Sequence, residues 1–181
     1  VPTKRQTLLF SATMPEDIRK LTVDILHDHT TVQVDPIAPA KTVSHALYPV
    51  PEALKRGLLL ALLEQTPAGR TLIFTRTKHR TKRLALDLAN HKYRVASLQG
   101  NLSQNRRQQS MDGFREGKFD ILVATDIASH GIDVPNLSHV INFDMPRSGD
   151  EYVHRIGRTG RAGAEGLAIS LICHNDWNLM S

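Results

Sequence analysis

"TLIFTRTKHRTKRLALDLANHKYRVASL", residues 71–98, places two short β-rich runs on either side of a longer polar segment. TLIFT and RVASL are typical of strands, whereas Leu84 and Leu88 recur between them at the spacing of one helix face. A strand, a helix and a second strand in this order predict parallel strands joined by a crossover helix.

The same alternation continues along the rest of the chain. Further strands are expected at 7–12, 45–50, 120–125, 139–143 and 167–172. Helices are expected within 14–26, 52–65 and 103–116, the last opening on Ser103 as N-cap. Several strand runs are apolar nearly throughout, which is typical of parallel strands covered on both faces. The sequence therefore predicts an α/β layered fold.

Composition sets loose limits on function. The chain has 181 residues, a formal net charge of +5 and one cysteine. The charge favours a polyanionic partner, and the single Cys173 excludes an internal disulfide. No apolar run is long enough to cross a bilayer and none resembles a signal peptide, so a cytoplasmic protein with no membrane partner is expected. One thiol without tetrahedral ligand spacing predicts no metal site.

One boundary is expected near residue 40. The stretch 34–44 contains two prolines and few apolar side chains, and we interpret 36–44 as a linker. Residues 1–35 are too short to fold alone, so we expect them to end a preceding domain, with a compact domain at 45–181. The alternative is that the first segment adds an edge strand to a single domain.

Polar clusters follow three of the expected strands, at 75–83, 99–107 and 126–133. Ligands of parallel sheets bind beyond the carboxyl ends of the strands. Thr125 can bind a phosphate and Asp133 a sugar hydroxyl. The alternatives are that Thr125 and Asp126 cap a helix and that the basic run after residue 75 is a solvated face.

"HRIGRTGRAG", residues 154–163, spaces Arg155, Arg158 and Arg161 three residues apart. We expect a helix from about Asp150 that breaks at Gly160, in which the side chains of His154, Arg155 and Arg158 emerge near one another. Guanidinium forks match phosphate oxygens and stabilise charge that develops in phosphoryl transfer. No G-x-x-x-x-G-K-[ST] loop is present, so the arginines are expected to meet a nucleotide held elsewhere.

Five ordered motifs, SATMP (11–15), LIFTRT (72–77), GNLSQNRR (100–107), ATDIASHGID (124–133) and HRIGRTGR (154–161), resemble those of DEAD-box ATP-dependent RNA helicases. The resemblance covers nearly the whole chain. It implies a RecA-like three-layer sandwich with a mostly parallel central sheet, in which 45–181 is the C-terminal RecA-like domain and 1–35 ends the first one. The wording of the motifs favours RNA over the alternatives, which are a DNA helicase or translocase of the same superfamily and a non-catalytic nucleic-acid-binding or dimerisation module.

The resemblance also implies roles for individual residues. Arg158 and Arg161 would contact the γ-phosphate of ATP, with Phe74 bracing the arginine finger, and His154 would link them to the first domain. The other implied positions are Gly131 and Asp133 for the nucleotide, Gly100, Gln104, Arg107, Thr125 and Arg76 for RNA, and Ser11 and Thr13 for coupling. The first domain would hold most of the ATP and Mg²⁺, so this chain alone is expected to be inactive. His130 stands where the family usually has arginine, which puts that position's role in doubt.

Overall fold

The computed structural model describes residues 2, 4–11, 14, 16–32, 42–66, 69–129, 134 and 137–179, without the side chains of 129, 162 and 177–179. The chain divides into two compact units, Val1–Ile37 and Ala38–Ser181. Each unit is described by itself.

The described residues of the first unit form one helix, α1 (Glu16–Ile25), which confirms the helix expected there. The strand expected at 7–12 is wrong for the residues described, because 7–11 form neither helix nor strand. Leu8 is 67% exposed and Phe10 is 87% exposed. A strand needs a neighbouring strand to accept its backbone hydrogen bonds, and the described part of this unit contains none.

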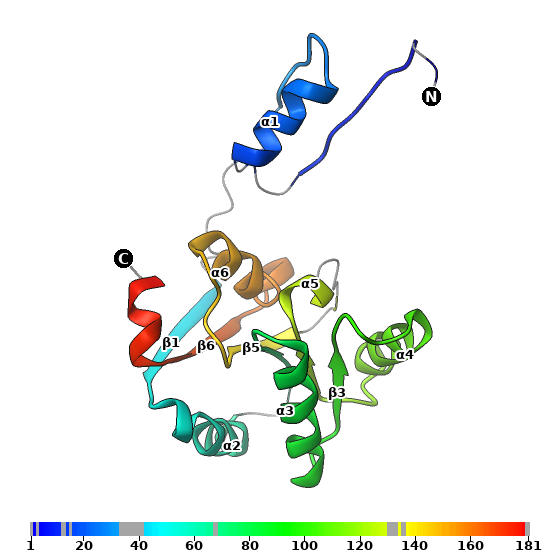
Figure 1. The fold of residues 1–181 in the computed structure, drawn as a ribbon. Coiled ribbons are helices and arrows are strands. Elements are labelled where there is room, and N and C mark those ends of the chain that lie inside the picture. Colours follow the sequence, from blue (N-terminus) through cyan, green and yellow to red (C-terminus); the bar gives the residue numbers. More distant parts are fainter. Residues whose placement is uncertain are drawn as a thin grey trace. The chain divides into compact units, whose positions relative to one another are not determined.

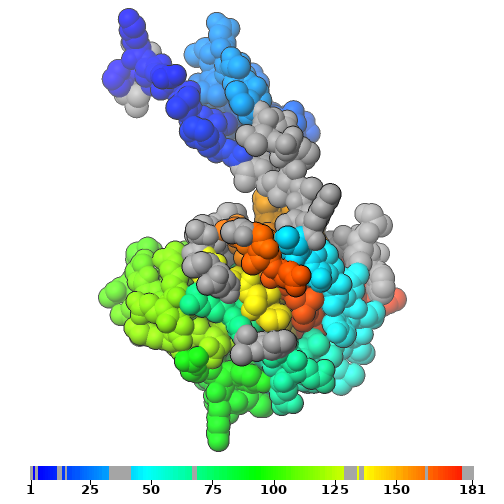
Figure 2. Space-filling model, turned by 180° about the vertical axis from the view of Figure 1, so that it is seen from behind, coloured from blue at the N-terminus to red at the C-terminus, as the bar shows by residue number. Residues whose placement is uncertain are grey.

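The second unit is built on one sheet of six strands in the order β1-β6-β5-β2-β4-β3. The strands are β1 (Val43–Pro49), β2 (Arg70–Phe74), β3 (Val95–Leu98), β4 (Ile121–Ala124), β5 (Leu137–Asn142) and β6 (Gly166–Ile172). Every neighbouring pair is parallel, which confirms the predicted sheet. Figure 2 shows β1, in cyan, beside β6, in orange. The predicted linker overlaps β1 by its last two residues.

Helices cover the sheet on both faces (Figure 1). One face packs against α2 (Lys55–Gln65), which follows the 3-10 turn η1 (Glu52–Leu54), and against α3 (Lys78–Asn90). The other packs against α4 (Gln104–Arg115), α5 (Asp126–Ser129) and α6 (Gly149–Ile156). In β2, Ile73 faces the first layer while Leu72 and Phe74 face the second. This period of two between two apolar layers explains why the strand is apolar throughout.

Short polar signals set where the helices start. Thr77, Ser103 and Ser148 are the N-caps of α3, α4 and α6, and each side chain accepts a hydrogen bond from a backbone N–H three residues later. At α6, the Glu151 carboxylate also accepts from the Arg147 N–H at 2.7 Å. This exchange resembles a capping box, and it fixes α6 at the carboxyl end of β5.

The connecting helices change face at the centre of the sheet edge that is formed by the carboxyl ends of the strands. β2 is followed by α3 on one face, whereas its neighbours β4 and β5 are followed by α5 and α6 on the other. Helices that leave neighbouring strands in opposite directions open a space beyond the strand ends. The polar residues that follow β2, β4 and β5 lie along this edge.

Candidate functional site

Arg155 anchors the arginine helix to the sheet. Its side chain is buried, and its Nε and Nη2 donate to the two carboxylate oxygens of Asp126 at 2.6 and 2.7 Å. Nη1 donates to Asn142 Oδ1 at 3.0 Å and to the Asp144 carbonyl at 2.7 Å. This guanidinium therefore joins α6 to the ends of β4 and β5.

The ring of Phe74 lies under the same guanidinium. The Arg155 Cζ is 4.8 Å from the ring centroid, within the range of a cation–π contact. The resemblance implied that Phe74 braces an arginine finger, but the structure places it against Arg155, which points into the protein. The expectation that Arg155 emerges near His154 and Arg158 is wrong for the same reason.

The two remaining arginines follow the end of α6. The helix ends at Ile156 rather than at Gly160, and the Gly157 N–H still bonds to the Val153 carbonyl at 2.9 Å. Arg158 is half-buried and its Nε donates to the His154 carbonyl at 3.2 Å. Arg161 is exposed and its Nε donates to the Gly157 carbonyl at 2.7 Å. Both guanidinium groups thus lie near the last turn of α6, as does the half-buried His154.

Gly160 sets the direction of the chain between these arginines. Its φ is 67°, in the left-handed region, and its carbonyl accepts from Thr42 Oγ1 at 2.8 Å. A Cβ on Gly160 would lie 2.5 Å from Val43 Cγ2. Only glycine fits this turn.

A second group of predicted residues lies beyond β3 and β4. Buried Gln99 accepts the Asn101 N–H through its side-chain oxygen at 2.8 Å, which holds the loop around exposed Gly100. A Cβ on Gly100 would meet nothing within 4 Å. This loop leads into the N-terminus of α4, where backbone N–H groups favour an anion.

The structure brings Arg107, Thr125 and α5 together at this place. The Thr125 N–H donates to the Leu98 carbonyl at 3.3 Å, so the ends of β3 and β4 are level. The Arg107 Nη2 lies 3.5 Å from the Ala128 carbonyl of α5. Gln104 is the first residue of α4, and it is exposed where the loop after β3 enters this helix. We call Gly100, Gln104, Arg107 and Thr125 the β3–β4 rim.

Arg76 follows β2 and has an ionic partner. Its Nη2 lies 3.2 Å from Asp176 Oδ1, in the 3-10 turn η3 (His174–Leu179), and its backbone N–H donates to Asp144 Oδ2 at 2.8 Å. Its side chain remains half-exposed at 47%. Arg76 therefore lies on the same edge as the rim, at the next strand of the sheet.

A buried ionic cluster beside Arg76 was not predicted from the sequence. Lys55 is 2% exposed; its Nζ donates to the Phe143 carbonyl at 2.9 Å and lies 3.6 to 3.9 Å from oxygens of Glu52, Asp144 and Asp176. Partial burial opposes ionisation of Glu52, but hydrogen bonds from Arg80 and Cys173 outweigh it and lower the pKa of this carboxyl. Such a cluster fixes α2, β5 and η3 to one another. Asp144, directly after an apolar strand, was the available signal for it.

Some predicted residues lie outside the described part of the chain. These are Thr13, His130, Gly131 and Asp133, so the expected ribose contact has no structural account. Ser11 is described and exposed, in a segment without helix or strand.

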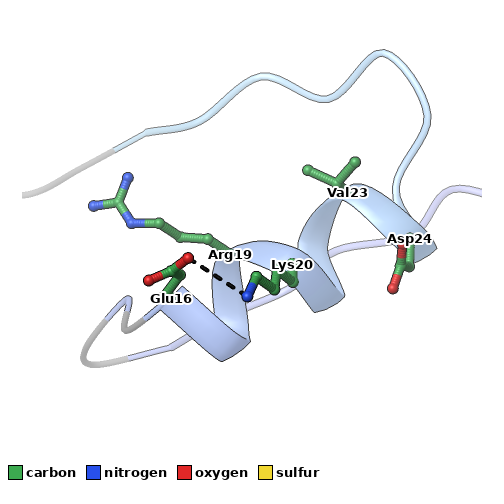
Figure 3. Close-up of a pocket in the computed structure, with 5 residues that line it drawn as sticks. All are labelled: Glu16, Arg19, Lys20, Val23 and Asp24. Carbon is green, nitrogen blue, oxygen red and sulfur yellow. Dashed lines mark ion pairs between the residues drawn. The ribbon is translucent and has the colours of Figure 1, made fainter.

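A pocket on the first unit is lined by Glu16, Arg19, Lys20, Val23 and Asp24 (Figure 3). All five belong to α1, and Glu16 pairs with Lys20 at 3.5 Å. Side chains of a single helix form an open face rather than an enclosed site. No described helix is long and apolar enough to cross a membrane, and no three described His, Cys, Asp or Glu side chains form a group that could hold a metal ion.

The chain belongs to the helicase conserved C-terminal domain family, whose model matches residues 54–163, and within it to the DEAD-box type. It is 42% identical to the ATP-dependent RNA helicase SrmB of Escherichia coli over 180 residues, which are 98% of this chain and 40% of that protein.

Two solved DEAD-box structures agree with this assignment. E. coli SrmB bound to regulator of ribonuclease activity A is 44% identical, with a TM-score of 0.70 over 75% of this chain and 81% of that one. S. cerevisiae Dbp5 bound to RNA and ADP BeF3 is 31% identical, with a TM-score of 0.87 over 99% of this chain and 48% of that one. The RecA-like fold is thereby confirmed. The chain spans less than half the length of the SrmB protein it matches.

Proposed function

We propose that this chain is the second motor domain of an ATP-dependent RNA helicase, together with the end of the first domain. Residues 1–35 then complete the first RecA-like domain through Ser11 and Thr13, 36–44 link the two, and 45–181 form the second. ATP and Mg²⁺ are held mainly on the first domain, with Gly131 and Asp133 of this chain touching the nucleotide. The relatives named above, which are RNA helicases or bind RNA, support this assignment.

In this proposal Arg158 and Arg161 meet the γ-phosphate when the two domains close on ATP, and His154 contacts the first domain. Both guanidinium groups now bond carbonyls of the last turn of α6 through Nε. Their Nη groups are the atoms that would form a fork with phosphate oxygens.

RNA is held through its backbone at the β3–β4 rim and by Arg76, where an open glycine, a helix N-terminus and two arginines line one sheet edge. Contacts of this kind fix position and carry little base specificity.

The observation that carries the proposal is the Arg155–Asp126 pair. Asp126 directly follows Thr125, and Arg155 lies three residues before Arg158, so one rigid contact connects the proposed RNA edge to the proposed finger helix.

The test is ATP turnover by the full-length protein at saturating ATP and RNA. Arg158→Ala should lower turnover by roughly a thousandfold or more, because a finger stabilises charge that develops in the transition state. Arg158→Lys should rescue little, since a point charge cannot reproduce the fork. Arg83→Ala, on the exposed face of α3, is the matched control and should leave turnover near that of the parent. Parental turnover in Arg158→Ala would exclude the finger assignment.

The 181-residue chain alone should release no phosphate from ATP with RNA and Mg²⁺, because it lacks a phosphate-binding loop. Competition between matched RNA and DNA strands tests the nucleic acid: equal affinity for both would favour a DNA helicase or translocase instead.

A further inference from the structure

The exposed side of α3 carries basic side chains that the proposed function does not use. Lys78, His79, Lys82 and Arg83 are all exposed, whereas the helix buries Thr81, Leu84, Ala85 and Leu88 against the sheet. The flank of α3 that faces α2 is neutralised by ion pairs, Arg80 with Glu52 and Asp87 with Arg56. The charge on the opposite flank has no such compensation.

Lys78 and Lys82 are four residues apart and lie on that opposite flank, toward β3. The Lys78 Nζ donates to Asn101 Oδ1 at 3.3 Å, a neutral partner in the loop that follows β3. Lys82 has no ion pair or hydrogen bond among the residues that the structure describes. We call Lys78 and Lys82 the α3 strip.

The α3 strip begins where the proposed RNA rim ends. Asn101, which Lys78 contacts, is the residue after Gly100. β3 is the edge strand of the sheet, and α3 packs against it (Figure 1), so no further strand separates this flank from solvent. A strand of nucleic acid leaving the rim past Gly100 would therefore pass first Lys78 and then Lys82.

The spacing of the two ammonium groups suits successive phosphates. Four residues of helix span about 6 Å. Phosphates of one strand follow one another at about 3.4 Å or more along its axis, so the two lysines can meet different phosphates.

We propose that the α3 strip is a second RNA-backbone contact, which holds the nucleotides that extend beyond the β3–β4 rim. The inference rests on the proposed function, because it requires RNA at that rim. The contact is electrostatic and independent of sequence, and it lengthens the bound RNA without taking part in ATP hydrolysis.

The test measures binding of single-stranded oligouridylates of roughly 6 and roughly 12 nucleotides to the full-length protein. The variant is Lys78→Gln with Lys82→Gln. The control is Arg115→Gln with Lys118→Gln, which removes the same charge just before β4, at the amino ends of the strands and so away from the rim. Thermal unfolding verifies that both variants are folded, and Arg107→Ala tests the rim.

The strip variant should bind the short strand like the parent and lose affinity for the long one by several-fold. For the long strand, the slope of log affinity against log salt concentration should be smaller in magnitude by about 1.4 in this variant. Each phosphate contact on a single strand contributes about 0.7 to this slope, and two lysines are removed. The control should bind both strands like the parent.

Parental affinity of the strip variant for the long strand would overturn the proposal, and so would equal weakening in the strip variant and the control, which reports net charge alone. In either case Arg107→Ala still weakens both strands if the rim binds RNA. A parent protein that binds neither strand would overturn the proposed function as well.

Discussion

Arg155 shows how a single residue of a repeated motif can differ from its neighbours. Its guanidinium is buried, makes four hydrogen bonds and lies over the Phe74 ring, whereas Arg158 and Arg161 lie near the surface at the end of the same helix. A buried charge needs this full set of partners, because desolvation costs several kcal/mol for an unpaired ion. Arg155 is therefore a positioning residue rather than a finger.

Arg155→Ala should lower the free energy of unfolding by about 3 kcal/mol, since it leaves Asp126, Asn142 and the Asp144 carbonyl without their donor. Arg56→Ala is the matched control, because Arg56 makes a similar bidentate pair with Asp87 but at an exposed site. Urea denaturation of both variants checks the difference. Equal losses would mean that burial does not decide the importance of these pairs.

His139 gives the fold a dependence on pH. It is 6% exposed on β5, and burial lowers the pKa of its imidazole. The unfolded chain then binds a proton more readily than the folded one, so stability is highest above the unfolded pKa, near 6.5, and falls as the pH drops from there toward the folded pKa. His139→Gln should flatten this fall, measured as the free energy of unfolding at pH 8 and pH 5.5. An unchanged difference between the two pH values would contradict the assignment.

At the scale of elements, the turn between α6 and η2 (Arg161–Gly163) depends on one glycine. Gly160 combines a left-handed φ with a close contact to Val43, so it fixes both the end of the segment that carries Arg158 and the approach of this segment to β1. Gly163 has a similar φ of 80° but open space around it, and Gly57, in α2, has neither constraint.

Alanine substitutions at these three glycines distinguish backbone strain from steric overlap. Gly160→Ala should destabilise the protein by about 2 kcal/mol or more, because left-handed strain of about 1–2 kcal/mol adds to the overlap with Val43. Gly163→Ala should lower the free energy of unfolding by the backbone strain alone. Gly57→Ala should raise the free energy of unfolding by about 0.5–1 kcal/mol, because alanine favours a helix more than glycine does. Thermal unfolding of the three variants gives the order, and a Gly160→Ala protein as stable as Gly163→Ala would remove the role assigned to Val43.

At the scale of the whole molecule, all three apolar clusters of the sheet unit are formed by residues from Val43 onward. The first unit, Val1–Ile37, exposes Leu8, Phe10 and Val32 instead. The larger unit therefore holds its own core, while the smaller one carries apolar surface that the proposed first domain would cover.

A chain of residues 42–181 should accordingly unfold at nearly the same temperature as the 181-residue chain, followed by circular dichroism. Removing residues 1–41 takes away no described member of the three apolar clusters. A fall of more than a few degrees would show that the first unit belongs to the same cooperative core.

The sequence by itself determined the class of fold and the positions of most elements. Short apolar runs, the helix face at Leu84 and Leu88, and the cap at Ser103 are local signals, and each was sufficient to place its element. The expected strand at 7–12 failed because pairing depends on a partner strand, which a local pattern cannot supply.

Tertiary structure alone decided which arginine points inward, that Phe74 supports Arg155, and that Lys55 lies between Asp144 and Asp176, which come from distant segments. It also decided that the basic flank of α3 continues from the loop at Gly100. These facts depend on burial and on contacts between residues far apart in the chain, and a charged side chain reads the same in sequence whether it is solvated or enclosed. The sequence could place these arginines and lysines at strand ends, but only packing decided which of them are enclosed and which remain on the surface.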